Sequence, residues 1–362
     1  MTLHPVSIRR WGLGLGFLLG SCFRAYASPG TDSAAFLNIP VGAGPAAMGS
    51  AYSALATDAY APISNPAGLS FLDSTQVAAQ HVSYLESISY EFLSVVHAIA
   101  PGDALGLSAQ YLGSGDITAI DKTGTPQGTY SDEFGAYSLA YGHAFSDRFG
   151  VGVTGKLIHI KLSDVSANAY ATDVGSLWRV TDHMNVSAVM SNLGTSVRFL
   201  DSSDPLPLAF HLGAAFSPSK YWILTGETVY ERTGLASGRA GAEWRPLEFM
   251  ALRVGYRSDT LKGLSALAGF STGFGLQLWG HEFAYAWVPY GDLGTSQYVS
   301  LVLRFGSPEN RNLIQYQHTK FESGDVSLLD GGGLENQSND QRYRRKVVQS
   351  VQAVPQGKGN TQ

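Results

Sequence analysis

From about residue 76 to residue 305, the sequence runs in segments of roughly ten residues whose side chains alternate between two faces. One segment places apolar side chains at every second position: Met250, Leu252, Val254 and Tyr256. The positions between them are small or charged, and the segments at 105–111 and 299–305 repeat the alternation. Beyond the N-terminus, no stretch is long and apolar enough to cross a bilayer as a helix. If the chain lives in a membrane, it must therefore close into a β-barrel, which pairs every backbone group.

Alternation alone also fits a soluble β-sandwich, so the connections between segments must separate the two folds. Six connections are short and rich in turn-forming residues: 101–103, 146–148, 181–183, 217–220, 245–247 and 271–273. Mostly longer polar connections fall between them: 86–89, 114–133, 163–168, 194–207, 231–237, 258–263 and 290–296. Tight periplasmic turns alternating with longer external loops are typical of outer-membrane barrels. The sequence thus predicts an all-β, transmembrane antiparallel β-barrel of about fourteen strands in the outer membrane of a Gram-negative bacterium.

Composition supports a membrane barrel and narrows the function. Charged residues make up only 15% of the chain, aromatic residues reach 11%, and the formal net charge is -5. Lipid of the outer membrane is the expected partner, and aromatic residues near strand ends are expected to form interfacial girdles: Tyr84, Tyr90, Tyr111, Phe145, Phe149, Phe216, Tyr221, Trp222, Trp244, Phe249, Tyr256 and Trp287. No basic and aromatic cluster indicates nucleic acid as a partner. The single Cys and the absence of metal-ligand spacing predict no disulfide framework, metal or cofactor.

The N-terminal pattern predicts a signal peptide over residues 1–27. Arg9 and Arg10 precede the apolar run 11–19, and the run Ala25-Tyr26-Ala27 offers small residues where signal peptidase cuts. The apolar run is shorter than the ~20 residues that a membrane anchor needs. An alternative is lipidation at Cys22, because 19–22 has the form of a lipoprotein cleavage box.

The stretch 36–69 is rich in Ala and Gly and lacks strand alternation. It carries Phe36-Leu37-Asn38-Ile39-Pro40-Val41-Gly42-Ala43, then Ala46-Ala47-Met48-Gly49-Ser50-Ala51, and finally Asn65-Pro66-Ala67-Gly68-Leu69. These runs resemble the N-terminal segment of the PorV/PorQ family, which is similar to the FadL-like long-chain fatty-acid transporters. The run 285–294 and the strand ending at Phe305 resemble the closing hairpin of that family. The chain departs from the family at Gly44-Pro45, where a basic residue usually follows Gly-Ala.

The resemblance implies a fourteen-stranded barrel over 76–306 whose N-terminal segment, 28–75, folds inward as a hatch. A segment inside the barrel is also expected from barrel size, because the strand side chains of a fourteen-stranded barrel cannot fill its lumen. We expect a short helix over 46–55 and a turn at 66–68 that leads into the first strand. The candidate hatch or ligand residues are Asn65, Pro66, Ala67, Gly68 and Leu69. The alternative is that these five residues form only a tight turn, bonded by the Asn65 side chain.

Several charged residues are expected on the lumen face of their strands, where charge is tolerated. The candidates for lining the lumen are His211, Arg239, Glu243 and Arg253, with Glu227 beside them. They could form a salt-bridged wet interior or line a ligand path, and the sequence does not separate these interpretations. Signatures of catalysis, such as a Gly-x-Ser-x-Gly elbow, are absent, so the chain is not expected to be an enzyme.

The tail 307–362 is polar, contains the basic run 342–346, and is expected to be disordered in the periplasm. We expect transport or binding of a hydrophobic small molecule across the outer membrane. The alternative, implied by the PorV resemblance, is a type IX secretion component that binds the C-terminal signals of cargo proteins, with secretion-system proteins as partners.

Overall fold

The computed structural model describes residues 32–84, 88–199, 202–234, 236–259, 266–291 and 294–306. The expected signal peptide with Cys22 and the expected tail at 307–362 lie outside the described residues. Within the described residues, no helix is long and apolar enough to cross a membrane.

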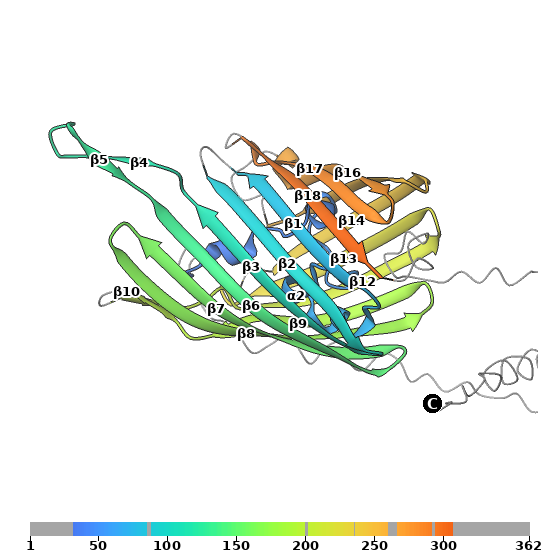
Figure 1. Ribbon diagram of the computed structural model, residues 1–362. Coiled ribbons are helices and arrows are strands. Elements are labelled where there is room, and N and C mark those ends of the chain that lie inside the picture. The colour runs from blue at the N-terminus through green and yellow to red at the C-terminus, as the bar shows by residue number, and fades with distance from the viewer. Residues whose placement is uncertain are drawn as a thin grey trace, which may run out of the picture. The chain divides into compact units, whose positions relative to one another are not determined.

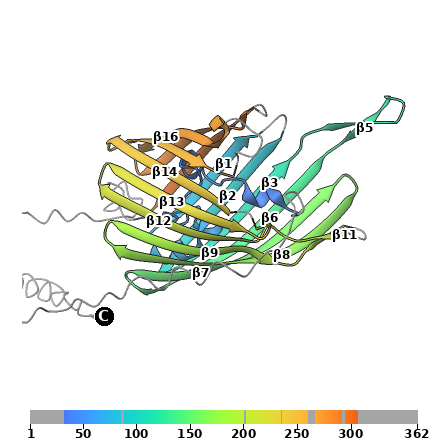
Figure 2. The same cartoon turned by 180° about the vertical axis from the view of Figure 1, so that it is seen from behind.

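Fourteen antiparallel strands form a closed barrel (Figures 1 and 2). In barrel order they are β1 (Thr75–Ser83), β2 (Ser89–Ala100), β3 (Asp103–Gly113), β6 (Asp132–Ser146), β7 (Phe149–Leu162), β8 (Val165–Thr181), β9 (Met184–Gly194), β12 (Ala209–Ser219), β13 (Trp222–Glu231), β14 (Ala236–Leu247), β15 (Met250–Arg257), β16 (Phe270–Leu278), β17 (His281–Pro289) and β18 (Thr295–Phe305). The first and last strands close the wall, with Ala79 opposite Leu301. The predicted fourteen-stranded barrel is confirmed.

The two rims differ in their connections. One rim carries six two-residue turns: 101–102, 147–148, 182–183, 220–221, 248–249 and 279–280. The other carries the hairpin of β4 (Ile117–Ile120) and β5 (Pro126–Tyr130), the hairpin of β10 (Val197–Phe199) and β11 (Ser202–Asp204), and the short helix η3 (Ala266–Gly269). Figure 1 shows β4 and β5 reaching beyond the barrel wall. This rim is called the long-loop rim below.

Three predicted connections are wrong. Residues 245–247, predicted as a turn, are the last residues of β14, and the turn falls at 248–249. Residues 271–273, predicted as a turn, lie inside β16, and the turn falls at 279–280. Two of these residues are small because they contact Ala47 inside the barrel. A Cβ on Gly273 would lie 2.7 Å from the Cβ of Ala47, and Ser271 Oγ donates to Ala47 O at 3.0 Å. The connection predicted at 163–168 is shorter, because β8 begins at Val165.

The outer face of the barrel is apolar, as lipid requires. Leu107 is 61% exposed and Leu139 is 57% exposed, although both are large and apolar. Most aromatic residues predicted for the girdles are also on the outer face, and Trp222 and Trp244 stack with their ring centroids 5.9 Å apart. Tyr90 is an exception. It is fully buried, and its hydroxyl accepts a hydrogen bond from Gln110 Nε2 at 2.7 Å.

Residues 32–72, called the lumen segment below, lie inside the barrel. They contain η1 (Ala35–Asn38), α1 (Ala43–Ala47), α2 (Ala61–Ser64) and η2 (Pro66–Phe71). Helix α1 packs on β15 to β18, and η2 packs on β3, β6, β7 and β8. The two ends of the segment thus contact different parts of the wall.

The helix expected over 46–55 does not form. Helix α1 stops at Ala47, and positive φ angles follow at Gly49 (63°) and Ser50 (58°). The backbone beyond them bonds to the wall instead, since Ala51 O accepts from Thr225 Oγ1 at 2.7 Å. The contact is close, because a Cβ on Gly255 of β15 would lie 1.9 Å from Gly49 N. Glycine in the wall therefore allows the two backbones to touch.

Candidate ligand cavity in the lumen

A cavity of about 100 Å³ lies between the lumen segment and the barrel wall. The lumen segment supplies its apolar side: Leu37, Ile39, Pro40, Val41, Pro45 and Ile63. Strands β7, β9, β12, β13 and β14 supply its polar side: Lys156, Ser191, Asn192, His211, Glu227 and Arg239. The lumen segment also adds polar lining residues: Asn38, Ser50, Tyr52, Ser53 and Ser64. The cavity is therefore amphipathic, and its apolar lining comes from the lumen segment alone.

A glutamine of β1 positions the apolar side. Gln80 is buried, its Oε1 accepts from Gly42 N, and its Nε2 donates to Pro40 O at 3.3 Å. These bonds fix the backbone on both sides of Val41. The extended run after η1 thereby presents its side chains to the cavity.

Glu227 organises the polar side. Its Oε2 accepts from Ser53 N at 3.0 Å and from Ser53 Oγ. Its Oε1 lies 2.9 Å from His211 Nδ1 and 3.6 Å from Arg239 Nη1. The Glu227 side chain is only 3% exposed, so these partners replace water around the carboxylate. Glu227 thus joins the lumen segment to three neighbouring strands.

A second buried ion pair borders the cavity at β7. Lys156 Nζ lies 2.6 Å from Asp173 Oδ2 and donates to Asn192 Oδ1 at 2.8 Å. Asp173 Oδ1 accepts from Asn192 N at 2.7 Å. Asn192 has a φ of 60° at an irregularity between β8 and β9, which lets its backbone N–H reach the carboxylate. The bulge is thus part of the site.

The connection after β15, at the long-loop rim, adds a further carboxylate to these ion pairs. Arg239 Nη2 donates to Asp259 Oδ2 at 3.4 Å, and Arg257 Nη2 donates to the same oxygen at 2.8 Å. Burial raises the pKa of Asp259, but the hydrogen bond and charge of Arg257 outweigh it, so the pKa lies at about 2. Asp259 is therefore ionised at neutral pH.

The structure brings two of the four predicted lumen residues to this cavity. His211 and Arg239 line it and meet at Glu227. Glu243 and Arg253 also face inward, but they form another cluster nearer the short turns. There Arg253 donates to Glu243 at 2.7 Å and to Glu282 at 2.7 Å. In that cluster the charged side chains pair with one another inside the barrel, as in the salt-bridged interpretation.

The five residues from Asn65 to Leu69 do not line the cavity. Asn65 Oδ1 accepts from Ala67 N at 3.0 Å, and Asn65 Nδ2 donates to Ser53 O at 2.9 Å and to Ser176 O at 3.2 Å. Pro66 begins η2, and Gly68 packs where a Cβ would lie 1.5 Å from Ala56 O. The run holds the lumen segment together and against β8.

Sequence reasoning missed Lys156, Asn192 and Ser53. The alternation in β7 could have identified Lys156, because Lys156 shares the inward-facing positions of that strand with Gly150, Gly152 and Thr154. No sequence pattern could have identified Asn192, since it reaches the cavity through the irregularity between β8 and β9. Among the described residues, no group of three or more His, Cys, Asp or Glu could hold a metal ion.

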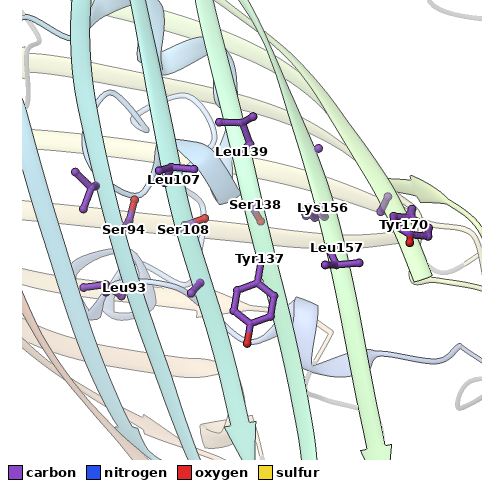
Figure 3. Close-up of a pocket in the computed structure, with 14 residues that line it drawn as sticks. Leu93, Ser94, Leu107, Ser108, Tyr137, Ser138, Leu139, Lys156, Leu157 and Tyr170 are labelled. Carbon is purple, nitrogen blue, oxygen red and sulfur yellow. The ribbon is translucent and has the colours of Figure 1, made fainter. Parts of the chain in front are cut away.

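A larger hollow of about 740 Å³ lies on the outer face and crosses β2, β3, β6, β7 and β8 (Figure 3). Exposed apolar residues such as Leu107, Tyr137 and Leu139 border it. In a membrane, acyl chains cover this face. The lumen cavity is the better candidate for a specific ligand, since it gathers polar groups beside an apolar side.

Comparison with solved structures finds the same architecture. The Pseudomonas putida toluene transporter TodX matches with a TM-score of 0.52 and 14% identity, covering 72% of this chain and 96% of that chain. The CymD monoaromatic hydrocarbon channel matches with a TM-score of 0.53 and 13% identity, covering 74% and 98%. The Ralstonia pickettii toluene transporter TbuX matches with a TM-score of 0.52 and 12% identity, covering 74% and 98%.

No protein-family model matches the chain, and no curated protein matches its sequence. The PorV/PorQ resemblance therefore rests on the quoted residues alone. At identities of 12–14%, the structural likeness establishes the fold, and the chain shares its overall architecture with these channels.

Proposed function

We propose that this chain is an outer-membrane protein that binds a hydrophobic compound in its lumen and passes it inward. The observation that carries the proposal is the amphipathic cavity between the lumen segment and the wall. The apolar exterior supports a place in the outer membrane, and the similar structures are described as toluene transporters and a monoaromatic hydrocarbon channel. The type IX secretion alternative gains no support from these neighbours.

The size of the cavity limits the ligand. Its volume of about 100 Å³ is below the ~300–1,000 Å³ typical of ligand pockets. An enclosed cavity of ~150 Å³ suffices for benzene. A compound with a single ring thus requires only a small displacement of the lining, whereas a long chain requires the lumen segment to move.

Uptake by whole cells tests the proposal. A deletion strain, and the same strain complemented with the wild-type chain, are given labelled compounds from toluene to a long-chain fatty acid. We expect the deletion to lower the uptake of at least one small apolar compound and complementation to restore it. Unchanged uptake across the whole panel would overturn the proposal.

Two matched variants locate the path. Ile39→Trp places a bulky side chain at the cavity, and we expect it to lower uptake. Leu139→Trp adds a similar bulk to the outer face, where the side chain is 57% exposed, and we expect uptake to stay normal. Heat-modifiable migration in SDS gels checks that both barrels fold. Equal uptake by both folded variants would exclude the cavity from the path.

A further inference from the structure

We propose that the ligand of the lumen cavity is a neutral compound with an apolar body and one oxygen function that accepts a hydrogen bond from Arg239. This inference rests on the proposed function and specifies its ligand. It excludes both a plain hydrocarbon and a carboxylate as the preferred ligand.

The first step is the hydrogen-bond donor. Arg239 lines the cavity, and its side chain is 11% exposed. Its Nη1 and Nη2 face Glu227 and Asp259, but Nε is buried with no hydrogen-bond partner among the residues that the structure describes. Because a buried donor is costly to leave unpaired, an acceptor on the ligand gains a bond that the protein itself does not supply. A plain hydrocarbon cannot make that bond.

The second step is the charge. The ion pairs that start from the cavity lining, followed through the described residues, join three cations to three carboxylates: Lys156, Arg239 and Arg257 with Asp173, Glu227 and Asp259. His211 adds positive charge only when it is protonated, and it already pairs with Glu227. A carboxylate ligand would enter a charge-balanced wall and lose its water without gaining a counter-ion of its own. A neutral acceptor avoids that cost.

The third step is the remaining polar contact. Oε1 of Glu227 faces His211 and Arg239, and Oε2 takes two bonds from Ser53, so this carboxylate is already well engaged. Ser191 Oγ lies 3.2 Å from His211 Nε2 at the cavity, and a hydroxyl can both donate and accept. An alcohol, a phenol or a carbonyl compound therefore fits the polar side, while its hydrocarbon body contacts Leu37 and Ile39.

Four probes built on one phenyl ring test the proposal: toluene, benzyl alcohol, benzaldehyde and benzoate. Their binding to the purified full-length chain in detergent is measured by ligand-observed NMR at about pH 8, above the range in which histidines usually titrate. Titrations of empty micelles correct for partitioning. We expect benzyl alcohol or benzaldehyde to bind about tenfold more tightly than toluene, and benzoate to bind more weakly than either.

A conservative variant tests the donor. Arg239→Lys keeps the positive charge between Glu227 and Asp259 but removes Nε as a donor, so the preference for oxygen over hydrocarbon should shrink toward unity. Arg148→Lys is the matched control, since Arg148 is 57% exposed at the short-turn rim and pairs with Asp182. If Arg239→Lys does not fold, the wild-type ranking of the four probes decides alone.

The outcomes separate this inference from the proposed function. Toluene binding as tightly as the alcohol and the aldehyde, or benzoate binding most tightly, would overturn the neutral oxygen ligand and leave a hydrophobic ligand in place. Failure of all four probes to bind would overturn both proposals for a ligand of this size.

Discussion

Ser53 donates its backbone N–H to Oε2 of Glu227 at 3.0 Å, so a carboxylate of β13 holds the lumen segment at the edge of the cavity. The carbonyl of the same residue accepts from Asn65 at 2.9 Å. The polar groups of Ser53 therefore bond both the wall and the far end of the lumen segment. A disturbance at either partner should reach the cavity through this residue.

Glu227→Gln should destabilise the barrel and loosen the lumen segment. The amide removes the negative charge that pairs with Arg239 and His211. Because Arg239 keeps Asp259 as a counter-ion, the loss should be smaller than the about 3–5 kcal/mol of a fully uncompensated buried charge. Urea unfolding in lipid vesicles measures the loss. Glu91→Gln is the matched control, because Glu91 also pairs with a histidine, His81, but is 48% exposed on the outer face. Equal losses for the two variants would contradict the role of Glu227.

Asn65→Ala should also destabilise the chain, by about 1–3 kcal/mol. It removes the donor to Ser53 O and Ser176 O and the acceptor for Ala67 N. Asn65→Asp keeps the acceptor but places a carboxylate against two carbonyl oxygens, so it should not restore stability. Unfolding midpoints of the three chains test this. A wild-type midpoint for Asn65→Ala would show that the run from Asn65 to Leu69 forms without the clamp.

Gly255→Ala should displace the lumen segment, because the new Cβ would lie 1.9 Å from Gly49 N. Overpacking of this kind costs about 1–3 kcal/mol. Gly155→Ala is the control, since a Cβ there meets nothing within 4 Å and the strand backbone needs no glycine. Unfolding midpoints and limited proteolysis of the lumen segment compare the two. If both variants behave like the wild type, the close contact is not a constraint.

The sequence predicts the fold well because a barrel imposes period two on every strand. The same alternation placed His211, Arg239, Glu243 and Arg253 inside. It could not tell which of them meet, since that depends on the register between strands. Glu243 lies opposite Arg253 on β15, whereas Arg239 lies opposite Arg257 on β15 and Glu227 on β13. Local patterns carry no information on these pairings.

Two of the errors share a physical origin, the lumen segment. Ser271 and Gly273 are small because that segment touches them, and small residues imitate a turn. The helix expected over 46–55 gives way because its carbonyl groups bond to wall side chains such as Thr225 and Asn185. Both errors arise where residues distant in sequence meet, which local propensity does not describe.

Lys156 and Asp173 should show strong energetic coupling. Their side chains are 3% and 0% exposed and 2.6 Å apart, so removing one partner leaves the other charge buried without compensation. Lys156→Met or Asp173→Asn alone should each cost about 3–5 kcal/mol. The double variant buries no unpaired charge, so it should lose much less than the sum of the single losses. A double-mutant cycle by urea unfolding in vesicles measures the coupling, and additivity within about 0.5 kcal/mol would contradict it.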